Sequence, residues 1–376
     1  MKVLMVITGL GMGGAEKVVT SLADQLVEKG HEVIIAYMTG EALVTPKNSS
    51  INLISLEVNS AKDLYSAYFK LRKLINKFKP DAVHSHLVHA NILCRTLRLT
   101  TAMPRLISSA HNTDEEGWTR FLAYRLTDKL TDISTNVSDE AVDAFIEQKA
   151  VRPGRMLTLH NGISTTEFVF SEKARSEIRA ELGIVDGQQL ILAVGRLSEQ
   201  KDYPNLLSAI SILSESQQNI KVAIAGQGPL LNELEERVNT LGIEDKICFL
   251  GVREDIPRLM SAADVFVLSS AWEGFGLVVA EAMACERIVV ATDCGGVKEV
   301  VGDAGFLVPP KDSVALATAL QQALTVSSDE RLQLGKKARH RVLQHYSLDM
   351  ATDKWLRLYS APIGKLATSL NNDIKA

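Results

Sequence analysis

Short apolar runs alternate with amphipathic helical patterns along most of the chain, and this alternation restricts the fold to a narrow class. In the first half, the runs expected to form strands are residues 2–7, 32–37, 82–84, 105–109 and 156–159. A helical pattern over about residues 15–29 separates the first two runs. Strand, helix and strand in repetition predict a mostly parallel sheet covered by helices.

A second series of the same kind follows a polar helical stretch at residues 172–182. Its expected strands are residues 190–194, 221–225, 246–250, 265–268 and 287–292. The chain has 376 residues, which exceeds what a single hydrophobic core usually supports. We therefore predict an α/β protein with two doubly wound domains in tandem, joined by a linker near residues 164–172.

The composition argues against several classes of protein. A formal net charge of -4 argues against a nucleic-acid-binding protein. The four cysteines form no CxxC pair and have no histidine at metal-ligand spacing, which favours reduced thiols in a cytoplasmic protein without a structural metal. Residues 3–7 are too few for the core of a signal peptide, and no later apolar run approaches the length of a membrane span.

Two carboxylates, Glu273 and Glu281, flank a Gly-Phe-Gly turn at residues 274–276. The turn follows an expected strand and precedes a helical pattern that begins at Leu277. Free amides at a helix start favour an anion such as a diphosphate, and carboxylates beside them can bind sugar hydroxyls. The pattern indicates a nucleotide-sugar site. The alternative is that both acids are solvent-exposed residues on an ordinary strand-to-helix connection, which would give the same sequence pattern.

A glycine-rich loop after the first strand satisfies the GxGxxG pattern with Gly9, Gly11 and Gly14. A nicotinamide-binding unit also needs an acidic residue at the end of its second strand to hold the ribose diol. Here the second strand is followed by no acid until Glu41. The sequence therefore disfavours an oxidoreductase, while the loop can still bring its backbone close to a phosphate or a sugar.

The segment Lys62 to Lys79 combines a broad apolar stripe with six cations and a single acid, Asp63. Such a helix can lie on an anionic membrane surface. The alternative is a helix that packs on the core with a basic exposed face. Contact with a membrane is therefore one of two expectations for this segment.

Four segments together resemble the retaining glycosyltransferases of family 4. They are residues 13–16, residues 194–197 with Lys201, residues 225–229, and residues 273–284. The resemblance spans nearly the whole chain and implies the GT-B fold, in which two Rossmann-like domains face each other across a cleft that holds the active site. It also implies that residues 1–168 with a C-terminal helix at 350–376 form the acceptor-side domain, and that residues 169–349 bind the donor.

The resemblance also implies roles for individual residues. Arg196 and Lys201 would neutralise the diphosphate. The planar guanidinium of arginine can donate two hydrogen bonds to phosphate oxygens, and the ammonium of lysine places a compact positive charge beside them. Glu273 would bind the hydroxyls of the donor sugar, and Glu281 those of the ribose. His111 would approach the transferred sugar from the acceptor side. The other residues implied to contact the donor are Gly13, Gly14, Gly226, Gly228, Arg253, Gly274, Phe275, Gly276 and Leu277.

Two further histidines, His84 and His86, end another expected strand, and His89 follows them. A zinc site would need a third and a fourth ligand at suitable spacing, and the sequence offers none. We therefore expect these histidines to line the acceptor side or to support other residues there.

The implied reaction transfers a hexose or N-acetylhexosamine from a nucleotide sugar, expected to be a UDP-sugar, with retention and without a metal or other cofactor. The expected acceptor is a growing glycan or a polyprenyl-diphosphate-linked glycan, as in O-antigen or capsule assembly. We expect a cytoplasmic enzyme at the inner face of the cell membrane. The alternatives are a nucleotide-sugar epimerase, a phosphorylase, a non-catalytic nucleotide-sugar-binding protein and a dehydrogenase.

Two positions depart from the family pattern. Asp202 stands where the family usually has glycine, and residues 285–288 replace a more usual Gly-x-Pro segment. Both lie near the expected donor site, so they bear on the identity of the donor more than on the class of reaction.

Overall fold

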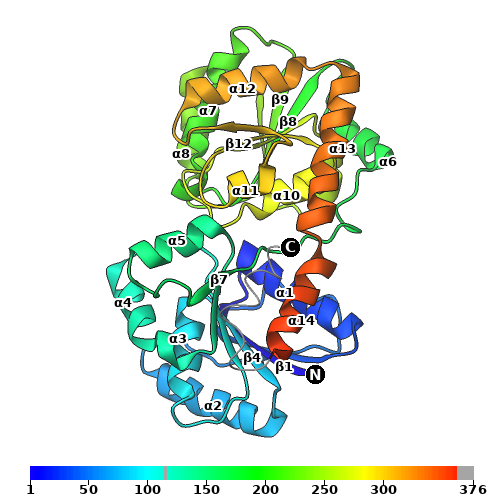
Figure 1. The fold of residues 1–376 in the computed structure, drawn as a ribbon. Helices are drawn as coiled ribbons and strands as arrows, with labels where there is room; N and C mark the ends of the chain where they lie inside the picture. The colour runs from blue at the N-terminus through cyan, green and yellow to red at the C-terminus, as the bar shows by residue number, and fades with distance from the viewer. Residues whose placement is uncertain (114–116, 362–376) are drawn as a thin grey trace. The chain divides into compact units, whose positions relative to one another are not determined.

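The computed structural model describes residues 1–113 and 117–361, which form two α/β units (Figure 1). The first unit contains Met1–Gly162 and helix α14 (Leu348–Ser360), and the second contains Ile163–Ser347. The division expected after residue 168 thus lies after residue 162. The helix expected at 350–376 begins at Leu348, and its positions 362–376 lie outside the described residues.

The first unit is built on a parallel sheet in which seven strands are described, in the order β3-β2-β1-β4-β5-β6-β7. The strands are β1 (Lys2–Gly9), β2 (Glu32–Thr39), β3 (Asn52–Ser55), β4 (Ala82–His86), β5 (Leu106–Ser109), β6 (Ile133–Asn136) and β7 (Met156–Thr158).

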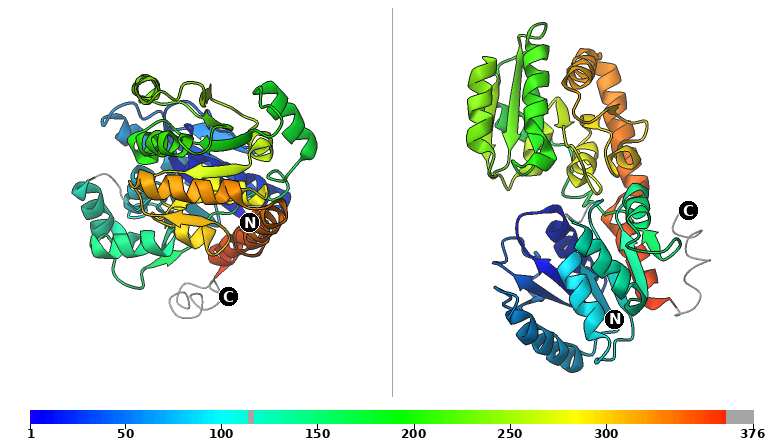
Figure 2. Two further views of the ribbon diagram at one scale, coloured as in Figure 1. Left: turned by 90° about the horizontal axis from the view of Figure 1, so that it is seen from above. Right: turned by 90° about the vertical axis from the view of Figure 1, so that its left-hand side faces the viewer.

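Helices cover both faces of this sheet (Figure 2). On one face, α1 (Gly14–Glu28) and α14 pack with Val3, Met5 and Ile7 of β1. On the other, α2 (Asp63–Phe78) and α3 (Val88–Leu97) pack with the intervening residues Leu4 and Val6. Burial on both faces explains why the strand reads as a continuous apolar run in the sequence. The remaining helices are α4 (Trp118–Thr127), the 3-10 turn η1 (Asp128–Leu130) and α5 (Asp139–Glu147).

The second unit, residues 163–347, is described throughout and contains a six-stranded parallel sheet in the order β10-β9-β8-β11-β12-β13. The strands are β8 (Gln189–Val194), β9 (Ile220–Ala225), β10 (Ile247–Gly251), β11 (Val265–Leu268), β12 (Ile288–Thr292) and β13 (Phe306–Val308). The two doubly wound sheets confirm the fold class that the alternating pattern predicts.

The helices of the second unit again lie on both sides of the strands. Helices α7 and α12 form one core with the sheet, and α10 packs on α13. The helices are α6 (Glu172–Glu181), the 3-10 turn η2 (Glu199–Lys201), α7 (Tyr203–Ser214), α8 (Leu231–Leu241), α9 (Ile256–Ala262), α10 (Leu277–Ala284), α11 (Val297–Val301), α12 (Ser313–Thr325) and α13 (Ser328–His345).

The strand orders bring the candidate residues to special places in each sheet. The order of strands reverses between β1 and β4 in the first unit and between β8 and β11 in the second. In open parallel sheets, ligands bind beyond the carboxyl ends of the strands at such switch points. The glycine loop lies at the carboxyl end of β1, and His86 is the last residue of β4. Lys201 and Glu273 follow β8 and β11.

Within residues 1–113 and 117–361, the helices are all too short or too polar to cross a lipid bilayer.

Candidate functional site

A lysine and a glutamate form the most buried ion pair among the predicted site residues. Lys201 Nζ lies 2.5 Å from Glu273 Oε1, and the two side chains are 16% and 8% exposed. Ser270 Oγ donates to the same carboxylate oxygen at 2.7 Å. Ser269 Oγ donates to the carbonyl of Lys201 at 2.8 Å, so the backbones on both sides of the pair are also linked. The pair is therefore held in a defined position beyond the ends of β8 and β11.

The loops after β8 and β9 approach each other backbone to backbone. The Gly195 amide donates to Ala225 O at 2.9 Å, and the Gly226 amide donates to the carbonyl at the end of β10 at 2.7 Å. A Cβ on Gly226 would lie 1.9 Å from Gly195 O, and one on Gly228 would lie 2.2 Å from Leu197 O. Side chains cannot fit at these two predicted positions. Arg196 projects from the same loop and is exposed.

The Gly-Phe-Gly turn leads into α10, whose first residue is Leu277 as the sequence predicts. Gly276 caps this helix with φ 81°, a left-handed conformation that favours glycine. In the first turn of α10, the Val279 amide donates to the carbonyl of Gly276 at 2.9 Å. The amides of Leu277 and Val278 precede it at the helix start, where an α-helix offers no intrahelical acceptor. The side chain of Phe275 packs inward, edge-on to Tyr346 with ring centroids 5.5 Å apart.

The loop after β12 packs against the backbone of the Gly-Phe-Gly turn and holds it in place. A Cβ on Gly295 would lie 1.8 Å from the carbonyl oxygen of Glu273. The Gly296 amide donates to the carbonyl of Gly274 at 3.2 Å. Glu281, one turn further along α10, is 3% exposed. The two acids thus belong to a rigid segment.

In the first unit, Gly13 and Gly14 form the start of α1. Gly13 is the N-cap, and the carboxylate of Glu16 folds back over it, since a Cβ on Gly13 would lie 2.4 Å from Glu16 Oε2. Burial raises the pKa of Glu16, while its own backbone hydrogen bond lowers it. A Cβ on Gly14 would meet no described heavy atom within 4 Å, so this glycine leaves open space at the helix start.

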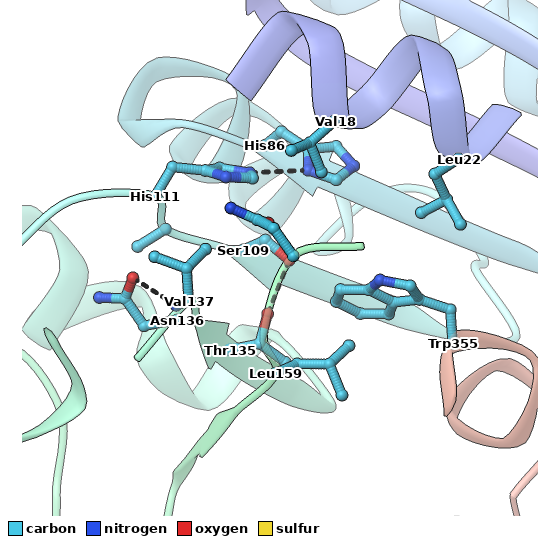
Figure 3. A pocket seen from close by; sticks show the side chains of 12 residues that line it. Val18, Leu22, His86, Ser109, His111, Thr135, Asn136, Val137, Leu159 and Trp355 are labelled. Atoms are coloured by element: carbon cyan, nitrogen blue, oxygen red, sulfur yellow. Dashed lines mark hydrogen bonds between the residues drawn. The ribbon is translucent and has the colours of Figure 1, made fainter. Parts of the chain in front are cut away.

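His111 follows β5 and faces His86 at the end of β4 (Figure 3). His111 Nε2 lies 3.1 Å from His86 Nδ1. Burial lowers the pKa of His111 to about 4 and holds the pKa of His86 well below its ordinary value, where the neighbouring histidines add to the effect. Both rings are therefore neutral near pH 7.

Comparison with known proteins decides the family. Residues 12–167 match the model of Glycosyltransferase Family 4, and residues 174–341 match that of Glycosyl transferases group 1. The GalNAc-alpha-(1->4)-GalNAc-alpha-(1->3)-diNAcBac-PP-undecaprenol alpha-1,4-N-acetyl-D-galactosaminyltransferase of Campylobacter jejuni is 30% identical over 376 residues, covering 95% of this chain and 98% of its own. The chain belongs to glycosyltransferase family 4.

Other known proteins agree with this assignment. The UDP-Gal:alpha-D-GlcNAc-diphosphoundecaprenol alpha-1,3-galactosyltransferase of Escherichia coli is 26% identical to this glycosyltransferase, over 80% of each chain. Among solved structures, HepE of Anabaena in complex with UDP and glucose matches with a TM-score of 0.83 and 21% identity, covering 96% of this chain and 100% of HepE. The fold of this glycosyltransferase is thus the GT-B fold.

The two departures from the family pattern have a conformational explanation in this glycosyltransferase. Asp202 adopts φ 44° and ψ 48°, the left-handed region in which glycine is usual and Asp is better tolerated than most residues. Its carboxylate also accepts from the Asn205 amide at 3.4 Å and so caps α7. Glu286 adopts φ 59° in the segment that replaces Gly-x-Pro. Both segments therefore contain a residue in the left-handed conformation that glycine favours.

Arg253 is already engaged by two carboxylates in this glycosyltransferase. Its Nε and Nη2 lie 2.7 Å and 2.8 Å from the two oxygens of Asp255, and Nη1 lies 2.6 Å from Glu181 Oε1. These hydrogen bonds, first to Asp255 and then to Glu181, raise the pKa of Arg253. Its role in donor binding stays a prediction, and these three hydrogen bonds use three of the five N–H donors of the guanidinium.

Sequence reasoning missed several residues that support the site of the glycosyltransferase. Ser270 and Gly295 hold Glu273, and Tyr203 Oη donates to the carbonyl of Gly195 at 3.1 Å. The contact of Gly295 with Glu273 depends on the pairing of β11 with β12. Ser270 and Tyr203 lie only three and eight positions from their partners, but a serine and a tyrosine at such spacing form no distinctive motif. His86 did carry a signal, because its i, i+2 spacing from His84 places both rings on the same face of β4. Among the described residues, no cluster of three or more His, Cys, Asp and Glu could hold a metal ion.

Proposed function

We propose that this glycosyltransferase moves a hexose or N-acetylhexosamine from a UDP-sugar to a lipid-linked or growing glycan, with retention of configuration and without a metal. The product would be a cell-surface polysaccharide such as O-antigen or capsule. The buried pair of Lys201 and Glu273 carries this proposal, because it sets a cation and a carboxylate side by side beyond the switch point of a parallel sheet.

Each member of the pair has a role in the proposed transfer. Breaking the bond between sugar and diphosphate leaves negative charge on the leaving oxygen, which fixed cations can neutralise in place of a divalent ion. Lys201 and the exposed Arg196 would supply that charge. Glu273 would orient the sugar hydroxyls and favour the positive charge that develops on the ring, and Glu281 would bind the ribose. Further residues would complete donor binding, namely Gly13, Gly14, Gly226, Gly228, Arg253, Gly274, Phe275, Gly276 and Leu277.

Retention would follow from attack on the face that the diphosphate leaves. A diphosphate oxygen would take the proton of the acceptor hydroxyl while the bond to the new oxygen forms on the same side of the sugar. His111 would contribute from the acceptor side. The protein then mainly positions the reactants and neutralises charge.

The names of relatives support the donor and the acceptor. HepE was solved in complex with UDP and glucose, and the name of the Escherichia coli relative includes UDP-Gal. The names of the Escherichia coli and Campylobacter jejuni relatives both include an undecaprenol-linked glycan. A lipid-linked acceptor would bring this enzyme to the inner face of the cell membrane.

Two helices of the first unit support contact with an anionic membrane. On α2, Tyr65 and Phe69 are exposed with ring centroids 4.7 Å apart, and Lys73 and Lys77 are exposed further along the helix. Helices α2 and α4 both pack against α3. The exposed residues of α4 include the apolar Trp118, Leu122 and Leu126 and the basic Arg125. The exposed Lys129 follows in η1. Aromatic and basic side chains together are typical of a surface that meets lipid headgroups.

The choice of nucleotide can be tested by thermal unfolding. With UDP at about 100 times its Kd, the stabilisation is about 2.7 kcal/mol, which raises the Tm of a unit of this size by about 5–10 °C. We expect this shift with UDP, unchanged by EDTA, and none with GDP, ADP or NAD. A shift with NAD alone would indicate a dehydrogenase instead. Release of labelled sugar from UDP-sugar without an acceptor or phosphate would contradict transfer.

Membrane contact can be tested by sedimentation with vesicles of phosphatidylcholine, with and without phosphatidylglycerol. Each Lys near an anionic surface contributes about 1 kcal/mol, so the double variant Lys73→Gln/Lys77→Gln is expected to bind anionic vesicles about 30-fold more weakly. Leu332→Ser, at an exposed position on α13, is the matched control and is expected to bind like the wild type. Equal binding of all three proteins would refute the role of α2.

A further inference from the structure

The two facing histidines of the first unit leave two buried nitrogens without partners. His86 Nδ1 and His111 Nε2 face each other at 3.1 Å. The outer nitrogens, His86 Nε2 and His111 Nδ1, are buried and have no hydrogen-bond partner among the described residues. Both residues line the same small pocket (Figure 3). An unpaired buried nitrogen costs free energy, so the pocket favours a ligand that pairs with it.

Neutrality restricts what the pair can offer to a ligand. Each neutral ring carries one proton, and one proton must lie between His86 Nδ1 and His111 Nε2. If His111 donates, His86 carries its own proton on Nε2 and His111 Nδ1 is a bare acceptor. If His86 donates, His111 carries its own proton on Nδ1 and His86 Nε2 is the bare acceptor. In either case the pair presents one donor and one acceptor, and both rings have the same tautomer.

The pocket suits a neutral partner of small size. It has room for about one water molecule or one hydroxyl group. None of the described residues that line it is Lys, Arg, Asp or Glu. Its other lining residues with polar atoms in their side chains are Ser109, Thr135, Asn136, Asn161 and Trp355. A carboxylate or phosphate would need donors alone, and an ammonium would need acceptors alone. A hydroxyl both donates and accepts, so it fits either state of the pair.

A second set of contacts holds His86 in place. The ring of His84 lies 3.9 Å from that of His86, centroid to centroid, and 4.3 Å from that of Trp355. His84 is itself fixed at both nitrogens, by Tyr359 Oη and by Ser109 Oγ, each at 2.7 Å. His86 therefore has little freedom to turn and can fix the orientation of His111.

We infer that this pocket is a hydroxyl-binding site and that His86 is the positioning residue that sets the ring orientation and tautomer of His111. The inference rests on the proposed function for one point, that the hydroxyl belongs to a carbohydrate. The pairing of tautomers holds independently of the reaction.

The pairing can be tested by NMR of the full-length protein labelled with ¹⁵N-histidine. We expect His86 and His111 to show the same tautomer, and His111 to become a mixture in His86→Phe, which lacks a polar atom at this place. His86→Asn, whose amide can replace Nδ1, is the matched variant and should restore a single tautomer of His111. Opposite tautomers in the wild type, or a His111 signal that is the same in all three proteins, would overturn the inference. The wild-type spectrum decides this even where a variant fails to fold.

The ligand is tested with two probes, UDP-glucose and UDP. UDP-glucose is expected to shift the His111 Nδ1 resonance and UDP to leave it unchanged. Equal spectra with both probes would overturn the hydroxyl site. In a transfer assay, His86→Phe is expected to lower kcat about 10- to 100-fold with KM for the donor nearly unchanged, and His86→Asn to recover most of it. Absence of transfer by the wild type would refute the proposed function and leave the NMR result intact.

Discussion

Replacing Lys201 by methionine is expected to lower kcat for sugar transfer by about 10²- to 10³-fold, the usual effect of removing one group that stabilises charge in a transition state. Methionine has a similar length and cannot carry the charge. The Lys201 ammonium is largely buried against Glu273, so solvent ions cannot replace it. A transfer assay with a labelled UDP-sugar measures the effect.

The same substitution leaves the buried Glu273 carboxylate without its cation, at a cost of about 3 kcal/mol in stability. The double variant Lys201→Met/Glu273→Gln removes both charges and keeps an oxygen for Ser270, so it should regain stability but not turnover. Arg258→Met is the control, because it removes an ion pair between α9 and Glu177 in which both side chains are about half exposed. It should change neither the stability nor the turnover. Near-normal turnover in a folded Lys201→Met protein would contradict the proposed role of the lysine.

Replacing Gly226 by alanine is expected to destabilise the second unit by more than about 3 kcal/mol, which corresponds to a fall in Tm of about 6–12 °C. The new Cβ would lie 1.9 Å from Gly195 O, so the loops after β8 and β9 would have to separate. The backbone at Gly226 has φ 146°, which adds strain for any residue with a Cβ. Differential scanning calorimetry measures the change.

Gly242→Ala separates the two causes, because Gly242 has φ 64° at the end of α8 but a Cβ there would meet no described heavy atom within 4 Å. It should cost only about 1 kcal/mol, the usual penalty for a left-handed residue other than glycine. UDP binding should weaken in Gly226→Ala and stay normal in Gly242→Ala. Equal losses of Tm in both variants would show that steric contact between the loops contributes nothing.

Strands buried on both faces were predictable because their sequences are almost entirely apolar. The run at residues 265–268 is an example, and the structure confirms it as β11. Three strands escaped prediction, namely β3, β6 and β13, with four, four and three residues. In β6, the buried residues Ser134, Thr135 and Asn136 are polar and form side-chain hydrogen bonds, so no hydrophobic pattern marks the strand.

The predictions of site residues concern single positions, and the roles of these residues stay predictions. The resemblance assigned Lys201 to the diphosphate and Glu273 to the sugar, and it did not predict that the two side chains touch. Likewise, His111 was predicted to approach the transferred sugar, and His86 to line the acceptor side or to support other residues there. The structure adds that the two rings face each other. Gly226 was predicted as a donor-binding residue, and the structure adds a steric reason for glycine there.

From the sequence by itself follow the two doubly wound sheets, the family, and the loops that carry the candidate residues, because periodicity and short motifs are local properties of the chain. Only the tertiary structure decided which of those residues meet. Lys201 and Glu273 are 72 positions apart and come together because β11 pairs directly with β8. His86 and His111 meet because β4 pairs with β5. Strand order depends on how the crossover connections pack the whole chain, and no single segment encodes it.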